Sequence, residues 1–78
     1  MADVFREMQR NPVGDWTMRD VERVCRKHGL TCSAPTGGGS HYKISHPASR
    51  EILTVPARRP IKPIYIRRLV RMIEGLGE

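Results

Sequence analysis

The sequence predicts a small two-layer α+β domain in the order α-β-β-β-α, with both helices on one face of a three-stranded antiparallel sheet. Apolar residues repeat at helical spacing over residues 18–28 and 64–74. They alternate with polar residues, as in a strand, over 30–34 and 41–46, and residues 51–55 are expected to be a third strand that Pro56 ends. Glycine and proline separate these segments, and 78 residues leave room for a single hydrophobic core.

Capping residues mark the two main helices. Thr17 followed by Asp20 resembles a capping box with Asp in place of Glu, so the first helix is expected from Met18 to about His28. Pro63 suits the first turn of a helix, which predicts the last one from about Ile64 to Glu74. The apolar stripes of both helices can then cover one sheet face, and the opposite face is left open to solvent or a partner.

Residues 1–15 are expected to be an N-terminal appendage, and residues 16–78 the single domain. Asp3 to Arg10 could form a short helix, because its apolar residues lie on one side and Asn11-Pro12-Val13-Gly14 would end it. The sequence leaves open whether this segment packs on the domain, contacts a partner or hangs free.

The chain is strongly basic. A net charge of +6 and a pI near 10.2 favour a polyanionic ligand or an acidic protein partner. Half of the 14 cations lie from residue 50 onward: Arg50, Arg58, Arg59, Lys62, Arg67, Arg68 and Arg71. This clustering favours a basic face around the third strand and the last helix.

The composition argues against several other classes. The two cysteines, Cys25 and Cys32, have no ligand partners at metal-binding spacing and are interpreted as small apolar fillers. We therefore expect no metal, no cofactor and no disulfide framework. The chain has no apolar run of about 18 residues and no signal-peptide core, so a cytoplasmic protein without a membrane partner is expected.

The second strand carries the candidate chemistry. Because side chains alternate, His41 and Lys43 are expected on the open face, about 7 Å apart, while Tyr42 and Ile44 face the core. A histidine has an unperturbed pKa near 6.5 and can act as a general base at cellular pH. It could deprotonate an RNA 2′-hydroxyl for attack on the adjacent phosphorus, with a cation neutralising the phosphoryl charge. Taken alone, His41 also fits an ordinary surface residue.

Two further segments could bind phosphate. Gly39 and Ser40 end a glycine run that allows close approach of backbone amides, although a plain hairpin turn explains the glycines as well. Arg58, Arg59 and Lys62 precede the last helix and could form a phosphate clamp or a solvated basic turn. The aromatic residues Trp16 and Tyr65 are expected to pack in or against the core.

The run from Gly39 to Pro47, GSHYKISHP, resembles the HicA family of toxin-antitoxin ribonucleases. Leu53-Thr54-Val55-Pro56 and a basic last helix extend the resemblance, which covers nearly everything after residue 10. The segment before Asp15 and the long glycine run depart from the family pattern.

The resemblance implies a double-stranded-RNA-binding-domain-like fold and metal-independent cleavage of messenger RNA, with His41 as the catalytic base. It also implies a HicB-like antitoxin that covers the active surface, and arrest of translation and growth as the cellular effect. Two other classes stay open. The same basic face could belong to a non-catalytic RNA-binding module, or to a protein-interaction module for an acidic partner.

Overall fold

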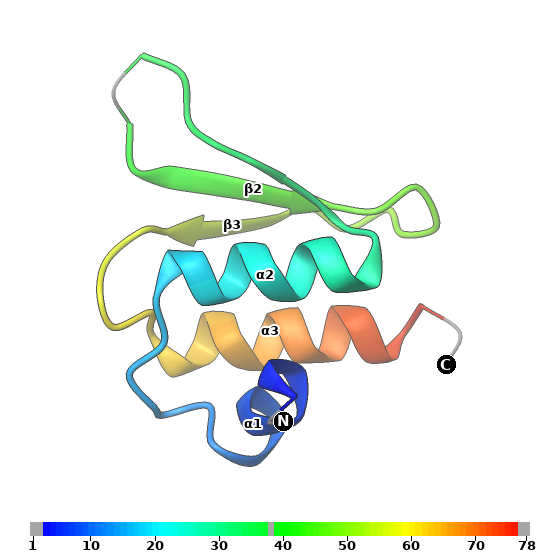
Figure 1. The fold of residues 1–78 in the computed structure, drawn as a ribbon. Helices are drawn as coiled ribbons and strands as arrows, with labels where there is room; N and C mark the ends of the chain where they lie inside the picture. Colours follow the sequence, from blue (N-terminus) through cyan, green and yellow to red (C-terminus); the bar gives the residue numbers. More distant parts are fainter. Residues whose placement is uncertain (1–2, 38, 77–78) are drawn as a thin grey trace.

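Three helices and three strands form the protein, which we describe from a computed structural model covering residues 3–37 and 39–76 (Figure 1). In chain order the elements are α1 (Val4–Arg10), α2 (Met18–His28), β1 (Thr31–Ser33), β2 (His41–Ser45), β3 (Leu53–Pro56) and α3 (Pro63–Glu74). The α+β class and the antiparallel three-stranded sheet agree with the sequence prediction.

The sheet is a meander with β2 in the centre. β1 and β2 are antiparallel with Cys32 opposite Ile44, and β2 and β3 are antiparallel with Ile44 opposite Leu53. In this register Ile44 and Leu53 lie on the core face, where Ile44 is fully buried. The neighbours of Ile44 and Leu53 along their own strands therefore point to the opposite face.

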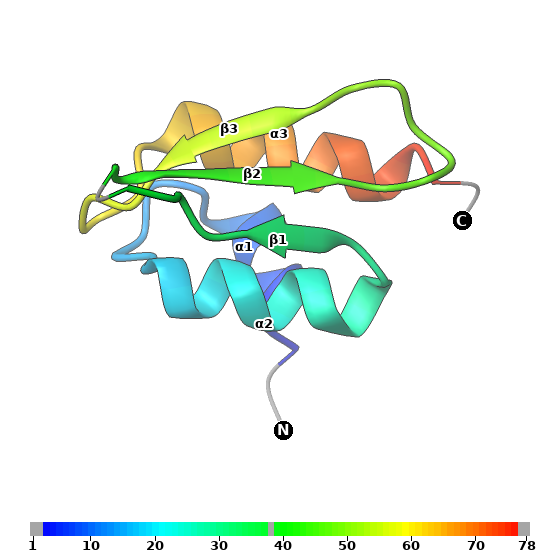
Figure 2. The ribbon, with the colours of Figure 1, turned by 90° about the horizontal axis from the view of Figure 1, so that it is seen from above.

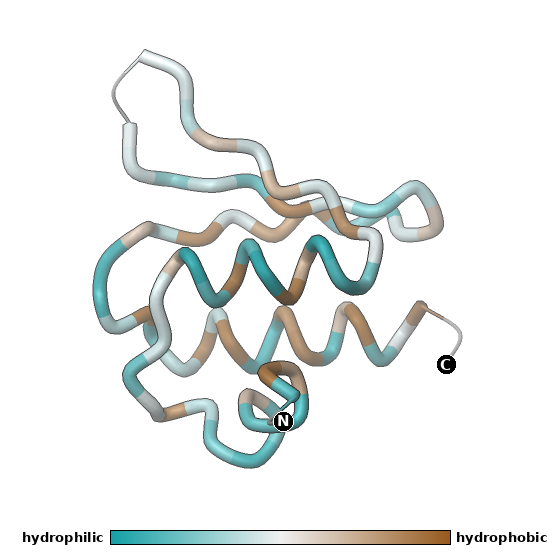
Figure 3. The backbone as a smooth tube through the Cα atoms, in the orientation of Figure 1, coloured by the Kyte–Doolittle hydropathy of each residue, from teal (hydrophilic) through white to brown (hydrophobic). Residues whose placement is uncertain are grey.

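Helices α2 and α3 lie side by side beneath one face of the sheet, and no described helix covers the other face (Figures 1 and 2). Apolar residues of both helices recur along the sides that are turned inward (Figure 3). The helix α1 packs against α2 and α3 on their far side from the sheet (Figure 1). The expected two-layer arrangement is thus present, and α1 adds a third layer.

Local sequence signals explain where α2 begins and ends. The hydroxyl of Thr17 accepts a hydrogen bond from the backbone N–H of Asp20, whose carboxylate accepts one from the N–H of Thr17. This reciprocal pair satisfies two amides that the first turn would otherwise leave unpaired. At the other end, Gly29 adopts a φ of 76°, which a glycine adopts without steric cost.

The helix α3 begins with Pro63, whose missing N–H is not needed in the first turn. Its buried face consists of Ile66, Leu69, Met72 and Ile73, which recur every three or four residues. The three arginines of this helix, Arg67, Arg68 and Arg71, are exposed.

Buried core residues come from all three helices and from β2 and β3, while β1 contributes only the half-buried Cys32. Among the described residues, thirteen apolar side chains are buried: Met8, Val21, Val24, Cys25, Leu30, Ile44, Leu53, Val55, Ile61, Ile66, Leu69, Met72 and Ile73. Met8 is fully buried and comes from the segment expected to be an appendage. Residues 3–15 therefore pack on the domain, which answers the question that the sequence left open.

Candidate nucleic-acid interface

The uncovered face of the sheet is polar on all three strands. The register places six polar residues on this face, from β1, β2 and β3 in turn: Thr31, Ser33, His41, Lys43, Ser45 and Thr54. All are exposed except Ser45, which is half-buried. Hydroxyl groups and a cation on an open sheet can hydrogen-bond phosphate oxygens and ribose hydroxyls, so the face suits a nucleic acid backbone.

His41 and Lys43 stand on this face as the alternation predicted. Both are exposed, whereas Tyr42, which lies between them, and Ile44, which follows Lys43, turn toward the core. Two positions along one strand are separated by about 7 Å, so the imidazole and the ammonium group can contact the same phosphate and its ribose. No carboxylate belongs to the described open-face positions.

His41 lies at the end of the sheet where several loops meet. It opens β2, directly after the β1–β2 connection, and its cross-strand partner is Pro56, the last residue of β3. One step further out, the carbonyl of Ser40 accepts a hydrogen bond from the N–H of Ala57, at 2.7 Å. The strand pairing therefore continues past His41 and fixes the backbone on both sides of it.

The glycine run acts mainly as a turn. Gly37 has a φ of 71° and so occupies the left-handed region that favours glycine. Gly39 has no such requirement, because an added Cβ would meet only the side chain of Pro35, at an ordinary 3.5 Å. Gly38 lies outside the described residues. Gly39 and Ser40 are both exposed beside His41, so their place is compatible with phosphate contact without indicating it.

Arg58 and Lys62 come together at the same end of the molecule. With Pro56 and Tyr65 they line a hollow of about 100 Å³ between the end of β3 and the first turn of α3. The sequence allowed Arg58, Arg59 and Lys62 to be a phosphate clamp or a solvated basic turn, and the structure brings Arg58 and Lys62 to one hollow. Tyr65 packs against the core, as expected, and is half-buried because its outer part forms a wall of this hollow.

Arg59 does not join this hollow. Its guanidinium donates two hydrogen bonds to the carboxylate of Asp15, at 3.2 and 2.8 Å, and so joins the α1–α2 connection to the β3–α3 connection. Hydrogen bonding between the two side chains raises the pKa of Arg59 and lowers the pKa of Asp15. A guanidinium has five donors, so Arg59 keeps others for a phosphate, but its orientation is set by Asp15.

The other two histidines have structural surroundings. His28, in the last turn of α2, packs its ring against Phe5 with the ring centres 4.8 Å apart, and its Nε2 has no hydrogen-bond partner among the described residues. His46 follows β2, and its Nδ1 accepts a hydrogen bond from the N–H of Ala48 within a turn. Of the three, His41 alone stands on the open face.

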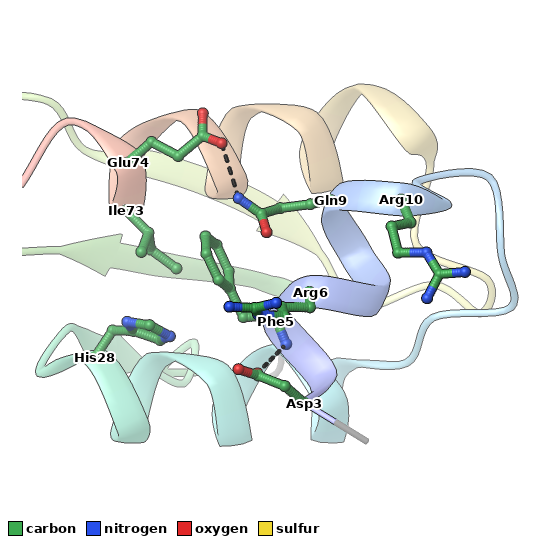
Figure 4. A pocket seen from close by; sticks show the side chains of 8 residues that line it. All are labelled: Asp3, Phe5, Arg6, Gln9, Arg10, His28, Ile73 and Glu74. Atoms are coloured by element: carbon green, nitrogen blue, oxygen red, sulfur yellow. Dashed lines mark hydrogen bonds between the residues drawn. The ribbon is translucent and has the colours of Figure 1, made fainter. Parts of the chain in front are cut away.

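A larger hollow of about 570 Å³ lies elsewhere, between α1 and the C-terminal ends of α2 and α3 (Figure 4). Its walls carry both charge signs, with Arg6 and Arg10 opposing Asp3 and Glu74. Gln9 donates a hydrogen bond to Glu74 across it. Because its charges balance and it lies on the far side of the helix layer from the sheet, this hollow does not belong to the basic face.

Residues 3–37 and 39–76 contain no group of three or more histidine, cysteine, aspartate or glutamate side chains that could hold a metal ion. The longest described helix, α3, has 12 residues, and none has the length and hydropathy of a membrane span.

Comparison of the chain with protein-family models, with curated proteins and with solved structures gives no significant match. The resemblance to HicA and the double-stranded-RNA-binding-domain-like fold therefore stay predictions from the sequence.

Proposed function

We propose that this protein is an endoribonuclease that cleaves messenger RNA and acts as the toxin of a HicA-like toxin-antitoxin pair. The observation that carries the proposal is an exposed histidine beside an exposed lysine on the uncovered polar face, next to a hollow lined by two cations. These are the groups that transfer within an RNA backbone requires: a base for the 2′-hydroxyl and cations for the phosphoryl oxygens.

The proposed reaction is a transesterification without a cofactor. His41 takes the proton of a ribose 2′-hydroxyl, and the 2′-oxygen forms a bond to the adjacent phosphorus. The bond from phosphorus to the 5′-oxygen breaks, and that oxygen takes up a proton as it leaves. The products are a 2′,3′-cyclic phosphate and a 5′-hydroxyl end. Lys43 is placed to offset the charge that grows on the phosphoryl oxygens, within about 7 Å of His41.

The decisive experiment is substitution of His41 by alanine in the purified protein. We expect the cleavage rate of single-stranded RNA to fall by about 10²- to 10⁴-fold, the usual contribution of a positioned base. His41 is exposed, so the free energy of unfolding should change by no more than about 0.5 kcal/mol. His46→Ala serves as a matched control, since it removes an imidazole from the turn after β2 and should retain the rate.

Two further observations would confirm the chemistry. Products should carry cyclic-phosphate ends in the presence of a chelator, and a 2′-deoxy substitution at the cleaved nucleotide should block the reaction. Unchanged cleavage by the folded His41→Ala variant would rule out His41 as the base.

A non-catalytic RNA-binding module is the alternative. It is favoured by the open face itself, where four hydroxyl side chains and Lys43 can bind phosphate and ribose without any base. This function predicts salt-dependent binding with RNA left intact after long incubation, and equal affinity for the parent and the His41→Ala variant.

We further propose a HicB-like antitoxin that covers the open face. An acidic partner would complement the net charge of +6, and a small acidic protein encoded beside this one is the first candidate to test. Co-expression of the two chains should suppress growth arrest, and the complex purified from these cells should not cleave RNA. A complex that cleaves RNA at the rate of the free protein would contradict this arrangement.

A further inference from the structure

The hollow between β3 and α3 has the composition of an anion site. Lys62 is the residue at the N-cap position of α3, and Tyr65 follows it by about one turn, so both lie on the same side of the helix start. Pro56 and Arg58 line the hollow with them. Two of its four lining residues are cations and none is acidic. The phenol of Tyr65 can donate a hydrogen bond as well as offer an apolar ring.

The size of the hollow limits what it can hold. Pockets that enclose a whole small molecule measure about 300–1,000 Å³. At about 100 Å³ this hollow cannot enclose a nucleotide, but it can seat one compact polar group. With Arg58 and Lys62 in its wall, that group is an anion of the size of a phosphate.

The strand register relates the hollow to His41. Pro56 is both a wall of the hollow and the cross-strand partner of His41, so the Cα atoms of the two residues are about 5 Å apart. On the neighbouring strand His41 is opposite Pro56 and Lys43 is opposite Thr54, whereas Arg58 follows Pro56 by two residues in the chain, beyond the end of β3. A phosphate in the hollow is therefore adjacent to the one that His41 and Lys43 address, and is not the same group.

We propose that the hollow lined by Arg58, Lys62 and Tyr65 binds the phosphate next to the scissile one in the RNA chain. This inference rests on the proposed ribonuclease function and makes it more specific, because the minimal substrate must carry a flanking phosphate. Arg59 is outside this site, held by Asp15.

Non-cleavable dinucleotides test the site separately from catalysis. We would titrate isotopically labelled protein with a 2′-O-methyl dinucleotide in three forms: unphosphorylated, 5′-phosphorylated and 3′-phosphorylated. One added phosphate should tighten binding by about tenfold, as a charge-assisted hydrogen bond does, and should shift the amide signals of residues 56–65 most. The two phosphorylated forms show on which side of the scissile bond the site lies.

Substitutions then assign the gain to the hollow. Lys62→Ala should abolish the gain from the added phosphate, and Tyr65→Phe should reduce it. Arg71→Ala removes the same charge about 13 Å further along α3 and should keep the gain. The amide spectrum of each variant shows that it is folded.

An equal gain in the parent and in the folded Lys62→Ala variant would overturn the inference, as would signal shifts confined to other residues. Neither result depends on cleavage, since the 2′-O-methyl group blocks it. Loss of the proposed activity and loss of this site are thus separate outcomes.

Discussion

Each of the three histidines has a role set by the backbone that carries it. His28 packs against an aromatic ring at a helix end, and His46 closes a turn through its Nδ1. His41 occupies an outward position of the central strand and is exposed. A general base must be accessible to the substrate whose proton it removes. His41 therefore differs from the other two histidines in its exposure and in its place on the open face.

Cys25 should make the stability of the protein sensitive to alkaline pH. Burial first, and then the neighbouring Cys32 and Glu22, raise the pKa of its thiol from 9.0 to about 12. The folded protein thus holds this proton more tightly than the unfolded chain. Its contribution to stability is complete below pH 9 and is lost as pH rises toward 12. Urea unfolding should show a steeper loss of stability over pH 9–12 in the parent than in Cys25→Ala, and parallel curves would contradict the assignment.

Sequence reasoning at the scale of the residue succeeded where the determinant was local. The alternation of one strand was enough to place His41 and Lys43 outward and Ile44 inward. It did not predict that Arg59 pairs with Asp15, because these residues are 44 positions apart and only the folded chain brings them together. The hollow beside Tyr65 was not predicted for the same reason, since another element, β3, contributes to it.

At the scale of the element, the helices were easier to predict than the strands. The helix α2 has the expected bounds, and α3 begins one residue earlier than expected, at Pro63. The strand β1 is one residue shorter than its pattern at each end, β2 ends one residue early, and β3 begins two residues late and ends one residue late. Before β3, the hydroxyl of Ser49 accepts a hydrogen bond from the backbone N–H of Glu51. This bond extends the preceding turn, and the strand begins only at Leu53. A helix carries its stop signals in its own sequence, whereas a strand ends where its partner ends.

The capping box makes Thr17 a measurable contributor to α2. Thr17→Ala removes the hydroxyl that accepts the N–H of Asp20, and it should lower the free energy of unfolding by about 0.5–2 kcal/mol. Thr17→Ser keeps the acceptor and should restore most of the loss. Chemical denaturation of the three proteins measures both effects, and equal losses in the Ala and Ser variants would show that packing, not capping, is responsible.

At the scale of the whole molecule, the layers separate two kinds of surface. The open sheet face is polar and carries His41 and Lys43, and the cations of the β3–α3 connection lie at one end of it. The opposite side is closed by α1, which packs on α2 and α3. The radius of gyration, 11.7 Å, is close to the value of about 11–12 Å for a compact domain of this length. The segment expected as an appendage is thus integrated into the fold.

Met8 tests whether α1 is required for the whole fold. Its side chain is fully buried and joins the core beneath α2 and α3. Met8→Ala should cost about 2–5 kcal/mol, through lost burial and the cavity left behind. A small domain has a free energy of unfolding of about 5–15 kcal/mol, so this variant should lose a large share of its stability.

Val13→Ala, in the connection after α1, provides an exposed control, because Val13 is 66% exposed and its truncation should change stability by no more than about 0.5 kcal/mol. Thermal unfolding of both variants compares the two positions directly. If Met8→Ala unfolds at the same temperature as the parent, the buried Met8 side chain does not stabilise the fold and this prediction is wrong. A large drop for Met8→Ala alone means that any partner that displaces α1 also destabilises the sheet, and with it the face that carries His41.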